Sequence, residues 1–226
     1  WGRVKRLEEV RWYLFLVLAG IIGMWAVGSW GGDMSAGESL RGAAFTVISI
    51  ASTTGYATAD YEQWPVAVYF ILMALMLVGG CAGSTSGGMK VGRVILLVRS
   101  ASQEIVKAFR PNQILRMQVN NNPIDDTARA QTVLFVALFA AMALASMVVV
   151  AVIETSHGTI DFETTVATVL ATFGNIGPGY GEVGPADNYA HFQPATHLFL
   201  SLLMILGRLE LYAVLVLFVP AVWKKY

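Results

Sequence analysis

The chain has 226 residues, of which 56% are hydrophobic and only 13% are charged. A soluble domain of this length needs a more charged surface, so the composition indicates an integral membrane protein. The formal net charge of zero gives no electrostatic reason to expect a nucleic-acid partner, and the single cysteine, Cys81, excludes an internal disulfide or a multi-cysteine metal site.

Four long apolar stretches are predicted to cross a bilayer. They cover about residues 12–30, 65–89, 130–153 and 195–223. A helix rises about 1.5 Å per residue and the hydrocarbon core is about 30 Å thick, so each stretch is long enough to span it. Tryptophans near their ends suit the interfacial belts of a membrane protein.

Two shorter stretches, 40–52 and 162–173, are apolar enough for helices but too short to cross. Stretches of this length are typical of re-entrant segments. Each is followed at once by a polar segment that contains glycine, TTGY at 53–56 and GNIGPG at 174–179. The order span, half-helix, glycine loop, span therefore occurs twice, which predicts an internal repeat.

The distribution of charge predicts the orientation. Lys and Arg gather before residue 12, between residues 90 and 129, and at 224–225. By the positive-inside rule these regions are cytoplasmic, as are both termini, and the glycine loops face the outer side. Residues 92–109 are expected to form a basic helix on the cytoplasmic side. The linker 111–126 then separates a first repeat, 1–110, from a second, 127–226.

The outer loops are rich in acidic residues. They carry Asp33, Glu38, Asp60, Glu62, Glu154, Asp161, Glu163, Glu182 and Asp187. A negative vestibule would raise the local concentration of cations. Alternatively, these loops simply lack basic residues, and the sequence leaves both readings open.

The two glycine loops are the candidate chemical site. Non-helical backbone at membrane depth is tolerated where it is buried in protein or lines water. Glycine lets carbonyl oxygens turn inward, and rings of carbonyls can replace the hydration shell of an alkali cation. Neither loop contains a carboxylate, which favours a monovalent ion over Ca²⁺ or Mg²⁺. The competing interpretation is that Gly55 and Gly177 merely end helices.

Two further features lie beyond the glycine loops in sequence. The second span of the first repeat contains Gly79, Gly80, Gly83, Gly87 and Gly88, too many for an unaided regular helix. We interpret this segment as a flexible gate loop; a helix-packing face of small residues is the alternative. Arg208 lies within the fourth apolar stretch, where a charge is costly. It is either an electrostatic barrier to cations or one partner of a structural ion pair, with Glu210 or a carboxylate elsewhere.

Four motifs, at 53–56, 79–90, 174–179 and 207–210, together resemble the third and fourth repeats of TrkH-type potassium uptake subunits, in the Trk/Ktr/HKT superfamily. The resemblance covers nearly the whole chain. It implies an all-α integral membrane protein with two repeats of span, pore helix, filter loop and span, forming half of a pseudo-fourfold potassium-channel-like pore. The implied potassium ligands are the main-chain oxygens of Thr53, Thr54, Gly55, Asn175, Ile176 and Gly177.

The same resemblance implies the partners. These are membrane lipid, a missing half with two further repeats, a second copy in a homodimer, and a cytoplasmic nucleotide-binding regulatory subunit. Because two of four repeats are absent and no Met begins the chain, we expect a fragment of a multi-pass protein of the cell inner membrane. It is expected to take up potassium without a cofactor and not to act as an enzyme.

Rival functions remain open at this point. A sodium-permeable or ion-coupled cation transporter of the same superfamily is the nearest. An intramembrane hydrolase could recruit Ser84 and His197, but no histidine motif on a second helix accompanies them. A carrier with inverted repeats is disfavoured because both repeats begin on the same side. An assembly module without transport is the last alternative.

Overall fold

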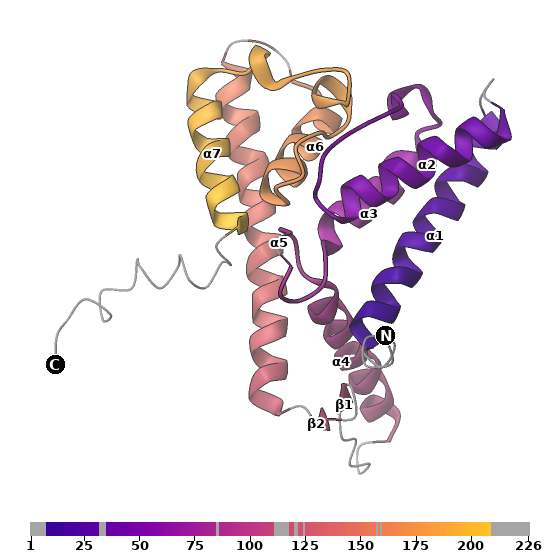
Figure 1. Cartoon of the computed structure of the whole chain (residues 1–226). Helices are drawn as coiled ribbons and strands as arrows, with labels where there is room; N and C mark the ends of the chain where they lie inside the picture. Colours follow the sequence, from indigo (N-terminus) through magenta and orange to yellow (C-terminus); the bar gives the residue numbers. More distant parts are fainter. Residues whose placement is uncertain are drawn as a thin grey trace, which may run out of the picture.

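The computed structural model describes residues 8–31, 35–84, 86–110, 118–119, 122–123, 125–156, 158 and 160–208 (Figure 1). The fold is almost entirely helical in this part of the chain. The helices are α1 (Glu8–Gly31), α2 (Ala36–Ala51), α3 (Ala67–Val78), α4 (Val91–Phe109), α5 (Asp126–Thr155), α6 (Phe162–Phe173) and α7 (Pro194–Arg208). Three 3₁₀ turns, η2 (Tyr61–Gln63), η3 (Gly181–Val183) and η4 (Tyr189–His191), and two short strands, β1 (Gln118–Val119) and β2 (Asn122–Pro123), complete it.

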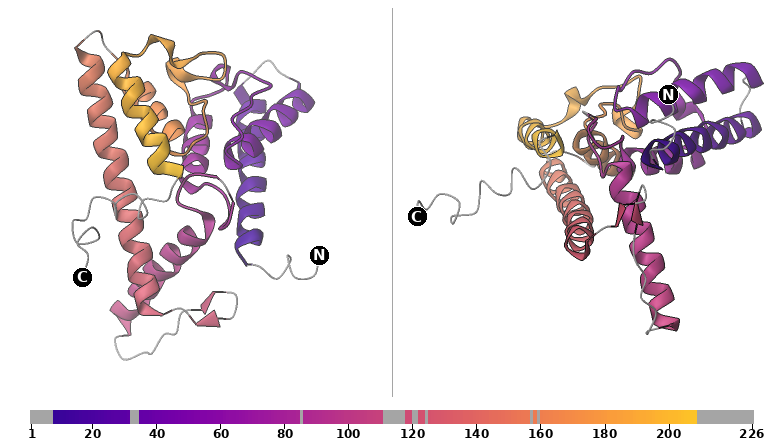
Figure 2. Two further views of the ribbon diagram at one scale, coloured as in Figure 1. Left: turned by 60° about the vertical axis from the view of Figure 1, so that its left-hand side comes forward. Right: turned by 60° about the horizontal axis from the view of Figure 1, so that its bottom comes forward.

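The helices form two groups that meet at the middle of the molecule. Helices α1, α2 and α3 pack together on one side, and α6 and α7 pack against α5 on the other (Figure 1). Helix α4 contacts α1 and the half of α5 that lies away from α6 and α7 (Figure 1). Figure 2 shows α4 leaving the bundle at an angle. The strands β1 and β2 pair antiparallel at this end, within the predicted linker.

Two helices among the described residues, α1 and α5, are long and apolar enough to cross a membrane. The apolar stretch 65–89 is interrupted, as its glycines predict, because α3 ends at Val78 after 12 residues. The glycines that follow explain this early end, since each disfavours helix by about 1 kcal/mol relative to alanine. Helix α7 is described only to Arg208, so the rest of the fourth predicted span lies outside the described residues.

The half-helices have lengths that prevent them from crossing. Helix α6 has the bounds that the sequence predicts, Phe162–Phe173. The predicted start of the other, at residue 40, is wrong because α2 begins at Ala36. Ser35 caps the start of α2 in a capping box. The Ser35 hydroxyl accepts a hydrogen bond from the Glu38 amide, and the Glu38 carboxylate accepts one from the Ser35 amide. At 16 residues α2 extends about 24 Å, still less than the hydrocarbon core.

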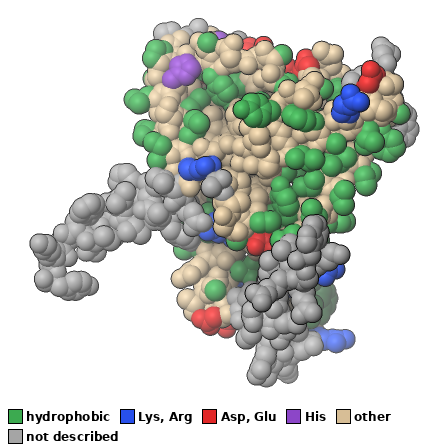
Figure 3. Space-filling model, viewed as in Figure 1, with side chains coloured by type: hydrophobic (Ala, Val, Ile, Leu, Met, Phe, Trp, Pro, Cys, Tyr) green, Lys and Arg blue, Asp and Glu red, His purple; other side chains and the backbone are tan. Residues whose placement is uncertain are grey.

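Apolar side chains fill two clusters and also cover much of the surface. One cluster joins α1, α2 and α3 to α6, and the other joins α5, α6 and α7. On the outward face of α1, Phe15 is 59% exposed and Ile22 61% exposed, and Figure 3 shows hydrophobic side chains spread over this side. Large apolar side chains exposed along whole helices are expected of a protein surrounded by lipid.

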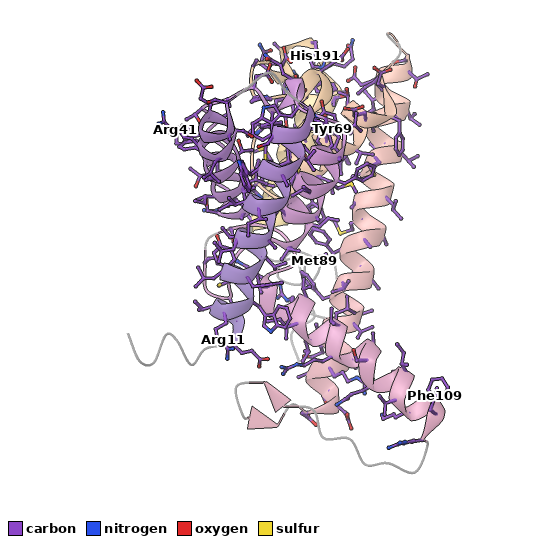
Figure 4. The ribbon with its side chains drawn as sticks, turned by 90° about the vertical axis from the view of Figure 1, so that its right-hand side faces the viewer. Arg11, Arg41, Tyr69, Met89, Phe109 and His191 are labelled. Carbon is purple, nitrogen blue, oxygen red and sulfur yellow. The ribbon has the colours of Figure 1, made fainter. Side chains whose placement is uncertain are left out.

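Ionic contacts hold α4 at the end of the bundle that the charge pattern predicts to be cytoplasmic. Arg99 of α4 pairs with Glu8 at the start of α1, and Glu104 of α4 pairs with Arg129 of α5. Figure 4 places Arg11 and Phe109 toward this end, with Arg41 and His191 at the other.

Candidate functional site

The two glycine loops begin with the same local structure. Helix α2 ends at Ala51 and α6 at Phe173, and the next residue of each, Ser52 or Gly174, has αR geometry. The Thr54 amide then donates to the Ser49 carbonyl at 2.8 Å, as the Ile176 amide does to the Ala171 carbonyl. The filter glycines lie beyond these turns, so the interpretation that they end helices does not hold.

The backbone angles of the two loops also correspond. Thr53 and Asn175 both have φ of +54°, and Gly55 and Gly177 have φ of +78° and +106°. Positive φ is uncommon outside glycine, and its occurrence at matched positions of two loops indicates a shared main-chain path. The predicted internal repeat is therefore present in the backbone as well as in the order of elements.

The loops lie against each other. A Cβ atom added to Gly55 would overlap the carbonyl oxygen of Ile176 and would lie 3.1 Å from Cδ of Pro178. Only glycine allows such a close approach of two main chains. The six residues singled out as ligands therefore come together from two segments that are far apart in sequence.

The segment between α3 and α4 folds as a compact irregular loop. Gly79 has φ of +69°, and the amides of Met89 and Val91 donate to the carbonyls of Leu77 and Gly80, both at 3.0 Å. These bonds bring the two ends of the loop together. Figure 4 places Met89 at mid-height, between Tyr69 and Phe109.

This loop touches the base of the second filter loop. A Cβ atom added to Gly87 would overlap the carbonyl oxygen of Gly174, the residue that follows α6. Gly87 of the predicted gate loop therefore lies next to the second glycine loop rather than in a lipid-facing helix. The alternative of a helix-packing face does not hold, because residues 79–90 form no helix among their described members.

Polar side chains that the sequence reasoning did not single out hold the gate loop. The Lys90 ammonium donates to the carbonyl oxygens of Ser84 and Ser86. The Glu9 carboxylate of α1 accepts from the amides of Ala82, at 2.5 Å, and Gly92, at 3.2 Å. Lys90 lies two residues after a glycine pair and could have been noticed, whereas the partners of Glu9 are distant in sequence and leave no local signal.

Arg208 lies at the last described position of α7, beside a cavity of about 190 Å³. The cavity is lined by Ser84, Ser86, Gly88, Lys90, Arg93, Phe135, Phe139, Phe173, Leu206, Gly207 and Arg208. Three of these residues, Lys90, Arg93 and Arg208, carry positive charge, and they lie on the side of the predicted filter where the predicted gate loop is. Glu210, the ion-pair partner considered for Arg208, lies outside the described residues.

The second filter loop is fixed to α7. The side-chain amide of Asn175 donates to the Met204 carbonyl at 2.9 Å, and a Cβ atom added to Gly207 would overlap the Phe173 carbonyl oxygen. The helix that carries Arg208 therefore packs directly on the end of α6.

Acidic groups surround the outer turns that follow the filters. Desolvation raises the pKa of Glu62, and the negative charges of Asp60, Asp187 and Glu163 raise it further. Such mutual repulsion shows that carboxylates from both repeats gather at this end. A nearby cation would relieve the repulsion.

Two spanning helices, apolar outer faces and paired half-helices that end in adjoining loops define an all-helical membrane transport protein. The family model for TrkH, described as "Cation transport protein", matches residues 6–225, so the chain belongs to the TrkH family.

Comparison with individual proteins agrees with the family. The chain is 37% identical over 214 residues to the Trk system potassium uptake protein TrkH of Halomonas elongata, covering 94% of this chain and 43% of that protein. It is 35% identical over 191 residues to the protein of the same name from Escherichia coli K12, covering 84% and 38%. The chain thus spans less than half the length of these relatives.

A solved structure has the same fold. The crystal structure of the potassium transporter TrkH from Vibrio parahaemolyticus superimposes with a TM-score of 0.86 at 26% sequence identity. The match covers 96% of this chain and 45% of the other. The predicted all-α membrane fold is therefore confirmed.

Proposed function

We propose that this chain forms half of a potassium-conducting pore and takes up potassium together with two further repeats. The ion ligands in this proposal are the main-chain oxygens of the two filter segments. These are Thr53, Thr54, Gly55, Asn175, Ile176 and Gly177. Potassium is the transported substrate, and the ligands are neutral, as suits a monovalent cation.

The close contact of Gly55 with Ile176 is the observation that carries the proposal. It brings two loops of the same backbone geometry to one place, each at the C-terminus of a half-helix. The carbonyl end of a helix dipole carries partial negative charge and stabilises a nearby cation. The relatives named as potassium uptake proteins support potassium as the ion.

Below the filter, we assign gating to the loop that contains Gly79, Gly80, Gly83, Gly87 and Gly88, with Arg208 as an electrostatic barrier. The cavity that Arg208 shares with Ser86 and Gly88 supports this assignment. A fixed positive charge beside a cation path raises the energy of the ion there.

The remaining features of the proposal concern the assembly. Residues 1–110 and 127–226 form the two repeats, joined by the linker 111–126, with both termini cytoplasmic in the inner membrane. The partners are lipid, the complementary half, a second copy and a cytoplasmic nucleotide-binding regulatory subunit. The chain acts as a transporter and not as an enzyme, and it needs no cofactor.

Co-expression tests this function. The chain is produced in bacteria that lack their own potassium uptake systems, together with a polypeptide that supplies the first two repeats of a TrkH relative. Both halves together are expected to restore growth at low potassium and uptake of Rb⁺. Absence of uptake with both halves present in the membrane would contradict the proposal. Equal uptake of Na⁺ would favour the sodium-permeable alternative.

A further inference from the structure

Tyr61 and Tyr189 occupy matching positions after the two filter loops. Each is the first residue of a 3₁₀ turn, η2 or η4. The residue before each turn, Asp60 or Asn188, caps it by accepting a hydrogen bond from a backbone amide of the turn. The two turns therefore present their tyrosines from the same kind of local structure.

Both tyrosine hydroxyls bind the second filter loop. Tyr189 donates to the Gly177 carbonyl at 2.6 Å, and Tyr61 donates to the Gly179 carbonyl at 2.5 Å. The two acceptors differ in their place in the loop. Gly177 is the filter glycine, whereas Gly179 lies beyond it, where the Gly179 amide also donates to the Val183 carbonyl at 2.7 Å.

The Gly177 amide donates a long hydrogen bond to the Ala171 carbonyl, at 3.5 Å. The φ of Gly177 is +106°, and a Cβ atom added there would meet no atom within 4 Å. Glycine adopts a wide range of backbone angles at little cost, and no side chain at this position packs against a neighbour to restrict them. The hydrogen bond from the Tyr189 hydroxyl is a short, directional restraint on the Gly177 carbonyl.

Tyr189 is well placed to hold this contact. Its ring is partly buried at the edge of both apolar clusters and lies 5.9 Å from the ring of Phe192. Burial also raises the pKa of the Tyr189 hydroxyl, so the group keeps its proton and remains a donor.

From this geometry we propose that Tyr189 is a positioning residue for ion selection, because its hydroxyl limits the movement of the Gly177 carbonyl oxygen. A carbonyl oxygen has two lone pairs, so one can accept from Tyr189 while the other faces an ion. Sodium is smaller than potassium and needs oxygens that approach more closely. A tethered oxygen yields less to the smaller ion. This inference rests on the proposed filter function.

Tyr189→Phe tests it in the co-expressed transporter. The variant keeps the ring and removes the hydroxyl. The potassium-over-sodium uptake ratio, taken from competition of each ion with Rb⁺, is expected to fall about tenfold, which corresponds to about 1.4 kcal/mol. Tyr61→Phe is the matched control, since it removes the same group from the same turn position but frees a carbonyl beyond the filter; its ratio is expected to stay unchanged.

The outcomes separate the inference from the function on which it rests. An unselective or inactive unsubstituted transporter would count against the proposed function. A selective unsubstituted transporter with an unchanged ratio in Tyr189→Phe would overturn the inference, even if total uptake fell. Loss of the Tyr189→Phe protein from the membrane, with Tyr61→Phe retained, would also overturn it, because the hydroxyl would then serve folding.

Discussion

The side-chain ammonium of Lys90 donates a hydrogen bond to the carbonyl oxygen of Ser84 at 2.7 Å. With a second bond to the Ser86 carbonyl at 2.8 Å, it closes the proposed gate loop on itself. Hydrogen bonds from a charged donor are stronger than neutral ones, so this contact stabilises the compact form of the loop. Lys90 has φ of +64°, which is unusual for a non-glycine residue.

Replacement of Lys90 by methionine is expected to increase Rb⁺ uptake several-fold, because the loop loses the donor that keeps it compact. Lys107→Met is the control, since Lys107 lies near the other end of α4 and pairs with Glu104 at the surface, at 3.6 Å. Uptake is measured per amount of protein in the membrane. Equal or lower uptake by Lys90→Met than by the control would contradict this role of Lys90.

Substitution of Gly55 by alanine is expected to reduce uptake more than tenfold. The new Cβ would overlap the Ile176 carbonyl, and the positive φ adds strain of about 1–2 kcal/mol. Gly37→Ala in α2 is the control, because a Cβ there meets nothing within 4 Å. Rb⁺ uptake and membrane abundance are compared for both. Normal uptake by Gly55→Ala would show that the close contact of the loops is not needed for transport.

Arg208→Ala is expected to raise cation flux, because it removes a positive charge from the cavity on the gate side of the filter. Arg208→Lys keeps the charge and should leave flux close to that of the unsubstituted protein. Rb⁺ efflux from vesicles that contain the co-expressed halves gives the rate directly. If the alanine and lysine variants have the same flux, charge at this position does not form the barrier.

The acidic outer turns predict a pH dependence. Glu62 has a raised pKa, so it takes up a proton at a higher pH than an ordinary carboxyl group and then no longer attracts cations. The KM for potassium should therefore rise as external pH falls from about 7 to about 5. Glu62→Gln should have a high KM at every pH in this range.

Glu38→Gln is the control for this experiment. A hydrogen bond from the Ser35 hydroxyl lowers the pKa of Glu38, so this carboxylate remains charged over the same range. It should therefore contribute no pH dependence, and its variant should keep the profile of the unsubstituted transporter. If the KM for potassium depends on pH in Glu62→Gln as it does in the unsubstituted transporter, the pH dependence belongs to another group.

The features that the sequence predicted well depend on local composition. The bounds of α6 follow from an apolar stretch between Asp161 and Gly174, and the interruption after Val78 follows from dense glycine. The start of α2 was missed although the Ser35 to Glu38 capping box is a local signal. The apolar pattern of this helix begins only at residue 40, after the cap and the first polar turn, so it places the start four residues too late.

Contacts between distant segments could not be predicted in the same way. Glu9 binds the amide of Ala82, and Tyr61 binds the carbonyl of Gly179, across long intervals of sequence. Neither contact involves a motif, since any exposed backbone amide or carbonyl could have been the partner. The sequence could predict the two filter segments as a set, but only the fold brings Gly55 against Ile176.

The end of α6 has a further consequence. Its last carbonyls, those of Phe173 and Gly174, are approached by the main chains of Gly207 and Gly87, from two separate segments. Contacts of this kind have a spacing set by peptide geometry rather than by the size of side chains. The distances from the end of α6 to the 79–90 loop and to α7 are therefore set by backbone against backbone, and substitutions elsewhere in the core can alter packing without changing them.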